Sequence, residues 1–287
     1  MTIPLILSTG SLYNFDISTV MALASEAGFD GVELMVDWRR ETFHRPHLEK
    51  LMRQHDLPIL AVHSPFAFMR LQGWPVDPVE IVHKSVQLAE NLGAQTVVVH
   101  PPTRWIRFQG IVAGPQRGWK ISLPLPVVGP GRLGRWLWGE LPDFQARSRV
   151  KIAVENMPCR HVGPFKLDPF HFTRPEQLNH FQFLTFDTTH AGTRQLDLLA
   201  FYRQIKPKVA HVHLSNYNGR EHQLLNNGHL PLAALLAQLV EDRFEGLVSV
   251  ELNPASLQAE DEAVLQQNLR ETVSFCRKVL SPAQAQR

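Results

Sequence analysis

The sequence lacks the features that would place it outside ordinary globular proteins. Its only two cysteines, Cys159 and Cys276, are too few for a disulfide framework, and their spacing matches no zinc motif. No apolar run approaches the roughly 18 residues of a membrane-spanning helix. The opening MTIPLILSTG has neither the basic segment nor the long apolar core of a signal peptide. These absences predict a protein of the reducing cytoplasm without a transmembrane segment.

The chain also lacks an excess of either charge. Its 29 Lys and Arg residues nearly balance 27 Asp and Glu residues, which leaves a formal net charge of +2. This balance neither requires nor excludes a polyanionic partner, because binding to nucleic acid depends on how charge gathers on one face. What the 287 residues do contain is apolar material, 44% of the total, together with 14 histidines. The apolar part is enough for a large core.

Eight short apolar runs recur along the chain, and segments with helical signals separate them. The runs are residues 4–8, 31–34, 59–63, 96–100, 151–155, 183–187, 209–213 and 247–251. Runs that are apolar almost throughout are typical of parallel strands buried on both faces. Strand–helix alternation repeated eight times predicts a (β/α)8 TIM barrel. The chain length fits, since such barrels need roughly 250 residues.

Helix ends are marked by capping residues. Asp16 and Asp77 are predicted N-caps, and Gly28 and Gly93 are predicted to end the same two helices. Further helices are expected over residues 47–55, 197–205, 231–242 and 261–280. All but the last fill an interval between two predicted strands, as the right-handed crossovers of a barrel require, and the last follows the eighth strand.

One interval is too long for a normal crossover. Residues 104–140 hold seven Gly, four Pro, six basic residues and the single acid Glu140. They also hold four of the six tryptophans: Trp105, Trp119, Trp136 and Trp138. We interpret this segment as an insertion between strands four and five of a single domain spanning 1–287. Because it begins near a strand end, we expect it to fold over or beside the barrel mouth, as a lid or a subunit contact, with several Trp partly buried.

Seven of the eight predicted strands finish on Glu, Asp or His. These residues are Glu33, His63, His100, Glu155, Asp187, His213 and Glu251. Any one of them could be an ordinary solvated or paired residue. Together they are harder to dismiss, because the strand ends of this fold converge on one mouth. Clustered carboxylates repel unless a cation lies between them, and His with carboxylate is the usual ligand set for zinc or manganese.

Four segments carry a resemblance to a known group of barrels. AVENMP (153–158), TFDTTHAG (185–192), HVHLS (211–215) and SVELN (249–253) resemble the strand ends of the xylose isomerase-like TIM barrel superfamily. That group includes sugar isomerases, ketohexose 3-epimerases, inosose dehydratase and the family 2 AP endonucleases such as endonuclease IV. The resemblance runs from Leu7 to about Leu280, apart from the insertion.

The resemblance implies a metal site and a set of neighbours. The ligands it implies are Glu155, Asp187, His213 and Glu251. A possible second site, as in endonuclease IV, would use His63 and His100 with Glu155. Its third zinc would need His190, His222 and an Asp where this chain has Arg220. We therefore expect no third metal.

The epimerase relatives imply roles in substrate binding instead. His190 and Arg220 resemble their substrate-contacting His and Arg, and His222 lies close by in the sequence. Glu33 is assigned either to substrate hydroxyls or to a capping and packing role, and the sequence leaves both open.

The function implied is a divalent-metal-dependent isomerase or epimerase acting on a small sugar. Its cofactor would be Mn, Zn, Mg or Co, and Glu155 and Glu251 would act as general acid and base through an enediolate. One alternative is an endonuclease IV-like phosphoester hydrolase acting on DNA. Arg220 and the lack of a clear DNA-reading element make a nucleic-acid partner the less favoured reading. Another alternative is a metal-binding barrel without catalysis, recruited through the Trp-rich insertion. A homo-oligomer fits either a lid or a seam role for that insertion.

Overall fold

The structure, a computed structural model of the chain, describes residues 2–66, 69–112, 119–126, 129–163 and 165–280. For residues 105–112, 119–126 and 162 the description covers the backbone alone.

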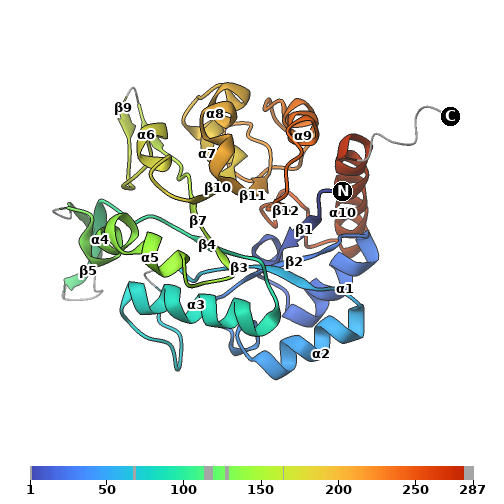
Figure 1. Cartoon of the computed structure of the whole chain (residues 1–287), viewed down its shortest axis with the longest axis horizontal. Coiled ribbons are helices and arrows are strands. Elements are labelled where there is room, and N and C mark those ends of the chain that lie inside the picture. Colours follow the sequence, from blue (N-terminus) through green and yellow to red (C-terminus); the bar gives the residue numbers. More distant parts are fainter. Residues whose placement is uncertain (1, 67–68, 113–118, 127–128, 164, 281–287) are drawn as a thin grey trace.

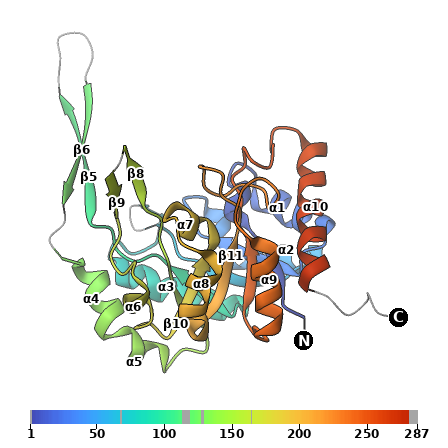
Figure 2. The same ribbon diagram turned by 90° about the horizontal axis from the view of Figure 1, so that it is seen from above.

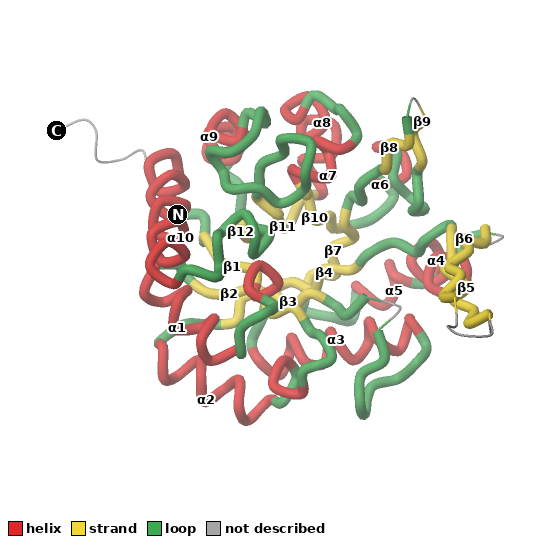
Figure 3. The backbone as a smooth tube through the Cα atoms, turned by 180° about the vertical axis from the view of Figure 1, so that it is seen from behind, coloured by secondary structure: helices red, strands yellow, loops and turns green. Residues whose placement is uncertain are grey.

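Eight parallel strands close into a barrel, in the spatial order β1-β12-β11-β10-β7-β4-β3-β2. Figures 1 and 3 show them as a central ring with helices outside. Their bounds are β1 Leu5–Ser8, β2 Gly31–Met35, β3 Ile59–His63, β4 Thr96–Val99, β7 Lys151–Glu155, β10 Phe183–Asp187, β11 Val209–Leu214 and β12 Leu247–Val250. The predicted TIM barrel is confirmed, and every predicted strand is present with ends that shift by at most one residue.

The described helices cover the outside of this ring. They are α1 Ile17–Ala27, α2 Arg45–His55, α3 Pro78–Leu92, α4 Gly131–Gly139, α5 Leu141–Gln145, α6 Pro175–Leu178, α7 Thr188–Thr193, α8 Leu198–Ile205, α9 Leu232–Glu241 and α10 Glu262–Leu280. Three 3-10 turns accompany them: η1 Thr9–Leu12, η2 Arg40–Thr42 and η3 Lys206–Lys208. No helix in the described ranges combines the length and the apolar character needed to cross a membrane.

The predicted helix caps are present. Asp16 accepts from the backbone N–H of Thr19 at 2.9 Å, and Asp77 accepts from that of Val79 at 3.0 Å. Gly28 and Gly93 have φ of 89° and 74°. This left-handed conformation is strained for residues that carry a side chain. One predicted start is wrong. The helix expected from residue 47 begins at Arg45, because a proline in its first turn needs no N–H partner.

The insertion has two parts that behave differently. Its first part is an antiparallel hairpin, β5 Trp105–Val112 with β6 Trp119–Pro126. Figure 2 shows this hairpin beside the barrel, extending away from it next to a second hairpin, β8 Arg160–Val162 with β9 Phe165–Leu167. The backbones join at the base of the hairpins, where the N–H of Arg104 donates to the carbonyl of Pro169 at 2.7 Å. The described strands of this hairpin therefore lie beside the mouth and not across it.

The second part of the insertion, α4 and α5, packs on the barrel. Trp136 is 4% exposed and meets the ring of His83 on α3 edge-on at 5.4 Å. Trp138 is half-exposed and stacks on His180, with ring centroids 3.8 Å apart. These two tryptophans agree with the expectation of partial burial. The side chains of Trp105 and Trp119 lie outside the described part of the structure.

The core is divided by the barrel wall. A large apolar cluster lies between the strands and the helices, and a small separate cluster of Ile6, Ala61 and Leu247 fills the inside. Fully buried polar side chains also lie on the barrel strands, among them Glu33 on β2, Thr185 on β10, His211 on β11 and Ser249 on β12. The barrel interior is therefore polar toward the mouth, where the candidate site residues gather.

Candidate metal centre

The structure brings the four predicted ligands together. Glu155 ends β7, Asp187 ends β10, His213 lies in β11, and Glu251 follows β12. One ligand atom from each lies within 4.8 Å of all the others. The common point is Nδ1 of His213, which lies 2.8 Å from Glu251 Oε2, 3.2 Å from Glu155 Oε1 and 3.7 Å from Asp187 Oδ2. Three carboxylates thus face one imidazole nitrogen.

Burial makes this cluster costly without a positive charge. Glu155, Asp187 and His213 are at most 1% exposed, and only Glu251, with a side chain 15% exposed, opens toward solvent. Buried carboxylates are stable only when paired with cations or hydrogen-bond donors. Among the described residues, Oε2 of Glu155 and Oδ2 of Asp187 have no hydrogen-bond donor. These two orphaned oxygens fit a site built for a cation.

A second predicted group shares Glu155. His100 places Nε2 2.8 Å from Oε2 of Glu155, and His63 places its own Nε2 3.8 Å from the same oxygen. The His63 contact is too long for a hydrogen bond, and the His100 contact, although short, does not have hydrogen-bond geometry. Atoms of this kind at such distances suit ligands of a shared ion. The possible second site therefore has its three residues in place.

The third group differs from the expectation. Asp187, His190 and His222 also offer ligand atoms within 4.8 Å of one another. The carboxylate in this group is that of Asp187 and does not come from the position of Arg220. Arg220 itself is exposed, and its backbone N–H donates to Asn218. Asp187 also belongs to the first group, so the expectation of no third metal stays a prediction, as does the substrate contact of Arg220.

Comparison with known proteins places these residues in a family. Residues 21–273 match the xylose isomerase-like TIM barrel family. An uncharacterized protein of Mycobacterium leprae is 31% identical over 283 residues, which cover 96% of each chain. The chain belongs to the xylose isomerase-like TIM barrel family.

Two solved structures show how widely this barrel is shared. The apo form of 3-keto-D-glucoside 4-epimerase from E. coli is 16% identical, with a TM-score of 0.67, over 96% of this chain and 99% of that one. The IOLI protein with a bound zinc atom is 20% identical, also with a TM-score of 0.67, over 97% of this chain and all of its own. At such identities the likeness concerns the fold.

Charge at the centre of this xylose isomerase-like barrel is strongly coupled. Burial alone would raise the pKa of Glu251, but the charge of His213 outweighs it and lowers the pKa to about 2. Burial alone would lower the pKa of His213, but Glu33, Glu251 and Glu155 together raise it well above its usual value. In the metal-free protein a proton on His213 therefore supplies the positive charge that the carboxylates need.

His190 has the same electrostatic setting. Burial alone would lower its pKa, but Asp187 and Glu155 raise it to about 9. Its Nδ1 lies 2.9 Å from the backbone carbonyl of Asn156. Asn156 also holds Asp187, since its side-chain oxygen accepts from the N–H of Asp187 at 2.7 Å. Asn156 was missed in the sequence, although it directly follows Glu155 in the AVENMP segment.

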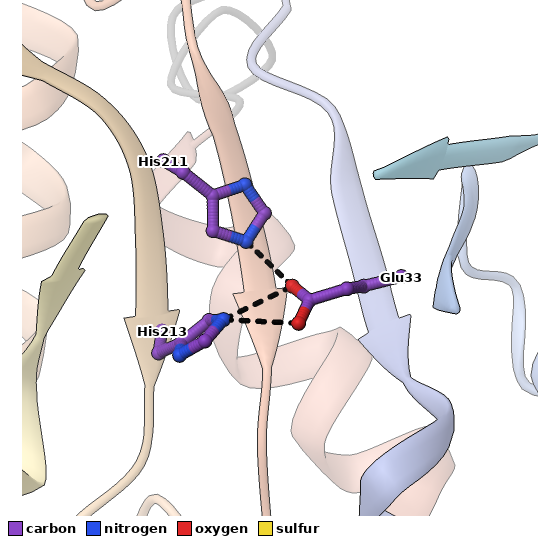
Figure 4. A group of neighbouring side chains, drawn as sticks. All are labelled: Glu33, His211 and His213. Atoms are coloured by element: carbon purple, nitrogen blue, oxygen red, sulfur yellow. Dashed lines mark hydrogen bonds and ion pairs between the residues drawn. The ribbon is translucent and has the colours of Figure 1, made fainter. Parts of the chain in front are cut away.

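Glu33 contacts His213 at Nε2, whereas the three carboxylates of the centre face Nδ1 of the same ring. Glu33 is fully buried, and both its carboxylate oxygens contact Nε2 of His213, at 3.0 and 3.1 Å. Oε2 also lies 2.6 Å from Nε2 of His211 (Figure 4). This geometry favours a positioning role for Glu33 over the contact with substrate hydroxyls. His211 was missed as well. Its signal was the alternation His211-Val-His213, which puts both rings on one face of a strand.

Proposed function

We propose that this barrel is a divalent-metal-dependent isomerase or epimerase of a small sugar or sugar derivative. The observation that carries the proposal is the convergence of Glu155, Asp187 and Glu251 on Nδ1 of His213. An imidazole nitrogen with carboxylate oxygens is a donor set suited to zinc or manganese. The orphaned oxygens of Glu155 and Asp187 support the same assignment. When bound, the ion would act as a Lewis acid on a carbonyl and its neighbouring hydroxyl.

Two carboxylates of the centre are placed to move a proton. Glu155 comes from β7 and Glu251 from the end of β12, with β10 and β11 between those strands in the barrel. The two carboxylates therefore reach the centre from separate strands of the barrel wall. One carboxylate accepts the proton from the carbon next to the carbonyl, and the C–H electron pair passes into the carbonyl to leave an enediolate. The other returns a proton to the opposite face of the same carbon, which gives the epimer. For an isomerase the proton goes instead to the former carbonyl carbon, while the neighbouring hydroxyl passes its proton to the former carbonyl oxygen and becomes the new carbonyl.

Other residues would hold the substrate. The ring of His190 is fixed through Nδ1 at Asn156, which leaves Nε2 for a substrate oxygen. His222 faces the same region, with its ring 5.5 Å from that of His190. The exposed Arg220 lies two residues before His222, and a contact of its side chain with substrate is part of the proposal.

The test is hydrogen exchange with solvent. The metal-loaded protein is incubated in D2O with a panel of ketoses and keto-sugars, and NMR follows deuterium at the carbon next to the carbonyl. Deuterium in product or recovered substrate is the expected result. A shielded proton could escape exchange, so the substrate deuterated at that carbon is also measured, and a primary isotope effect is expected. Turnover with neither exchange nor an isotope effect would rule out proton abstraction.

A second candidate function rests on the second group. His63 and His100 share Glu155 with the first group, as two neighbouring metal ions would require. Two-metal centres are typical of phosphoester hydrolysis. The discriminating measurement is metal content per chain, together with cleavage of DNA that contains an abasic site. Two tightly bound ions with cleavage would favour the hydrolase, and one ion with carbon-bound exchange would favour the isomerase or epimerase.

A further inference from the structure

We infer that Glu33 and His211 form a buried relay that presents Nδ1 of His213 to the metal. This inference rests on the metal centre of the proposed function. In Figure 4 the carboxylate of Glu33 faces a nitrogen of each of the two histidine rings. It is 2.6 Å from Nε2 of His211 and 3.0 Å from Nε2 of His213. The rings are nearly perpendicular, at 84°, with centroids 5.0 Å apart. Each therefore directs one nitrogen at the same carboxylate.

The contact decides which nitrogen of His213 is free. An ionised carboxylate only accepts hydrogen bonds, so the hydrogen of a neutral His213 must sit on Nε2. Its lone pair is then on Nδ1, which faces Glu155, Asp187 and Glu251. The opposite tautomer would set a lone pair against Glu33 and leave a buried charge unpaired. Glu33 therefore selects the tautomer and the ring orientation that a metal ligand needs.

His211 is the second histidine that contacts Glu33. Glu33, His211 and His213 are all fully buried, so Glu33 has no water to complete its hydrogen bonding. The Nε2–H of His211 supplies its second donor. Nδ1 of His211 has no hydrogen-bond partner among the described residues, which leaves Glu33 as the group that orients the ring.

The relay crosses the inside of the barrel. Glu33 is on β2 and both histidines are on β11, while β1 and β12 lie between those strands in the ring. The side chain of Glu33 therefore reaches across the interior from a non-neighbouring strand to contact the metal ligand His213. Another buried polar atom on the neighbouring strand, Oγ of Ser249, has no hydrogen-bond partner among the described residues.

The test measures metal affinity without substrate. Glu33→Gln and His211→Asn are compared with Ser249→Ala, a control at a buried position that pairs in register with His213. Zinc affinity is measured by chelator competition, and the visible spectrum of the cobalt(II) form reports the ligand field. Both relay variants should bind zinc about 10- to 100-fold more weakly and shift the cobalt bands. The control should change neither, and a cooperative unfolding transition of each metal-free variant shows that it is folded.

Each result decides the matter. Glu33→Gln with unchanged zinc affinity and cobalt spectrum would overturn the relay. If Glu33→Gln weakens zinc binding and His211→Asn does not, His211 is not part of the relay. If Glu33→Gln does not fold, His211→Asn, which keeps the carboxylate, decides on the same readouts. A natural chain that binds no divalent ion overturns the inference. A chain that binds metal but exchanges no carbon-bound hydrogen instead overturns the proposed function and leaves the relay standing.

Discussion

Glu155 and Glu251 both face His213, yet their surroundings differ. The Glu155 side chain is 1% exposed and also contacts His100 and His190, at 2.8 and 3.2 Å. The Glu251 side chain is 15% exposed and has no second histidine at such a distance among the described contacts. A carboxylate shared by two ligand groups is tied more strongly to metal binding, and an accessible one is freer to reach substrate. We therefore expect substitution of Glu155 and of Glu251 to affect metal binding to different extents.

Glu155→Gln and Glu251→Gln should each lower turnover by about 10²- to 10⁴-fold, because each removes a proton acceptor. Glu155→Gln should also reduce metal content more than Glu251→Gln, since Glu155 belongs to two ligand groups. Turnover is measured at saturating metal, and bound metal by elemental analysis. Glu245→Gln, at an exposed position, is the matched control. Either site variant retaining more than a tenth of natural turnover would contradict the assignment.

At the scale of elements, the insertion is two units with different partners. The β5–β6 hairpin forms a sheet of its own, whereas α4 contributes Leu137 and Trp136 to the main core. His83 and Phe144 stack at 4.5 Å and extend that contact from α3 to the residues after α4. The sequence-based boundary of 104–140 therefore joins a projecting hairpin to a packed helix.

Replacing residues 106–125 with a short Gly-Ser linker should leave the barrel folded. The hairpin pairs only with itself in the described sheets, so its loss exposes no barrel strand. We expect lower turnover or a changed oligomeric state, measured by kinetics and by mass in solution. Trp136→Ala is the contrasting variant and should destabilise the fold by about 3–5 kcal/mol, because it empties a buried site. A hairpin deletion with full turnover and unchanged mass would refute a lid or subunit role.

At the scale of the whole molecule, protons and metal compete for the same centre. Below about pH 6.5 the raised pKa of His190 leaves it protonated in both folded and unfolded chains, so its full stabilisation is present. That stabilisation is lost as pH rises through the folded-state pKa of about 9. The raised pKa of His213 acts in the same direction. A metal ion that takes Nδ1 of His213 displaces a proton, so metal affinity should rise over the same range.

The metal-free protein should therefore lose thermal stability between about pH 6.5 and 9, while added zinc or manganese should restore it increasingly toward the alkaline end. Unfolding temperatures at a series of pH values, with chelator or with metal, measure both trends. His190→Gln should flatten the metal-free slope, and His44→Gln, at an exposed position, should not. Parallel curves with and without metal would show that the ion does not compete with these protons.

Much of this arrangement follows from the sequence alone. Eight apolar runs bounded by turn residues require parallel strands buried on both faces, and parallel strands joined by helices bring their ends to one mouth. That topology is why the sequence alone predicts that Glu155, Asp187, His213 and Glu251 lie close together. Capping by Asp16 and Asp77 is likewise local, because the side chain bonds to backbone within one turn.

Only the tertiary structure decided the rest, since it depends on atoms from distant strands meeting in three dimensions. The pairing of Glu33 with His211 and His213 joins residues 178 and 180 positions apart across the barrel interior. No local pattern gives that distance or tells which ring nitrogen faces which carboxylate. The same holds for Asp187, which lies near His190 and His222 where the sequence suggested a missing ligand. Residue type and strand order follow from the chain itself, while side-chain direction follows from register and barrel closure.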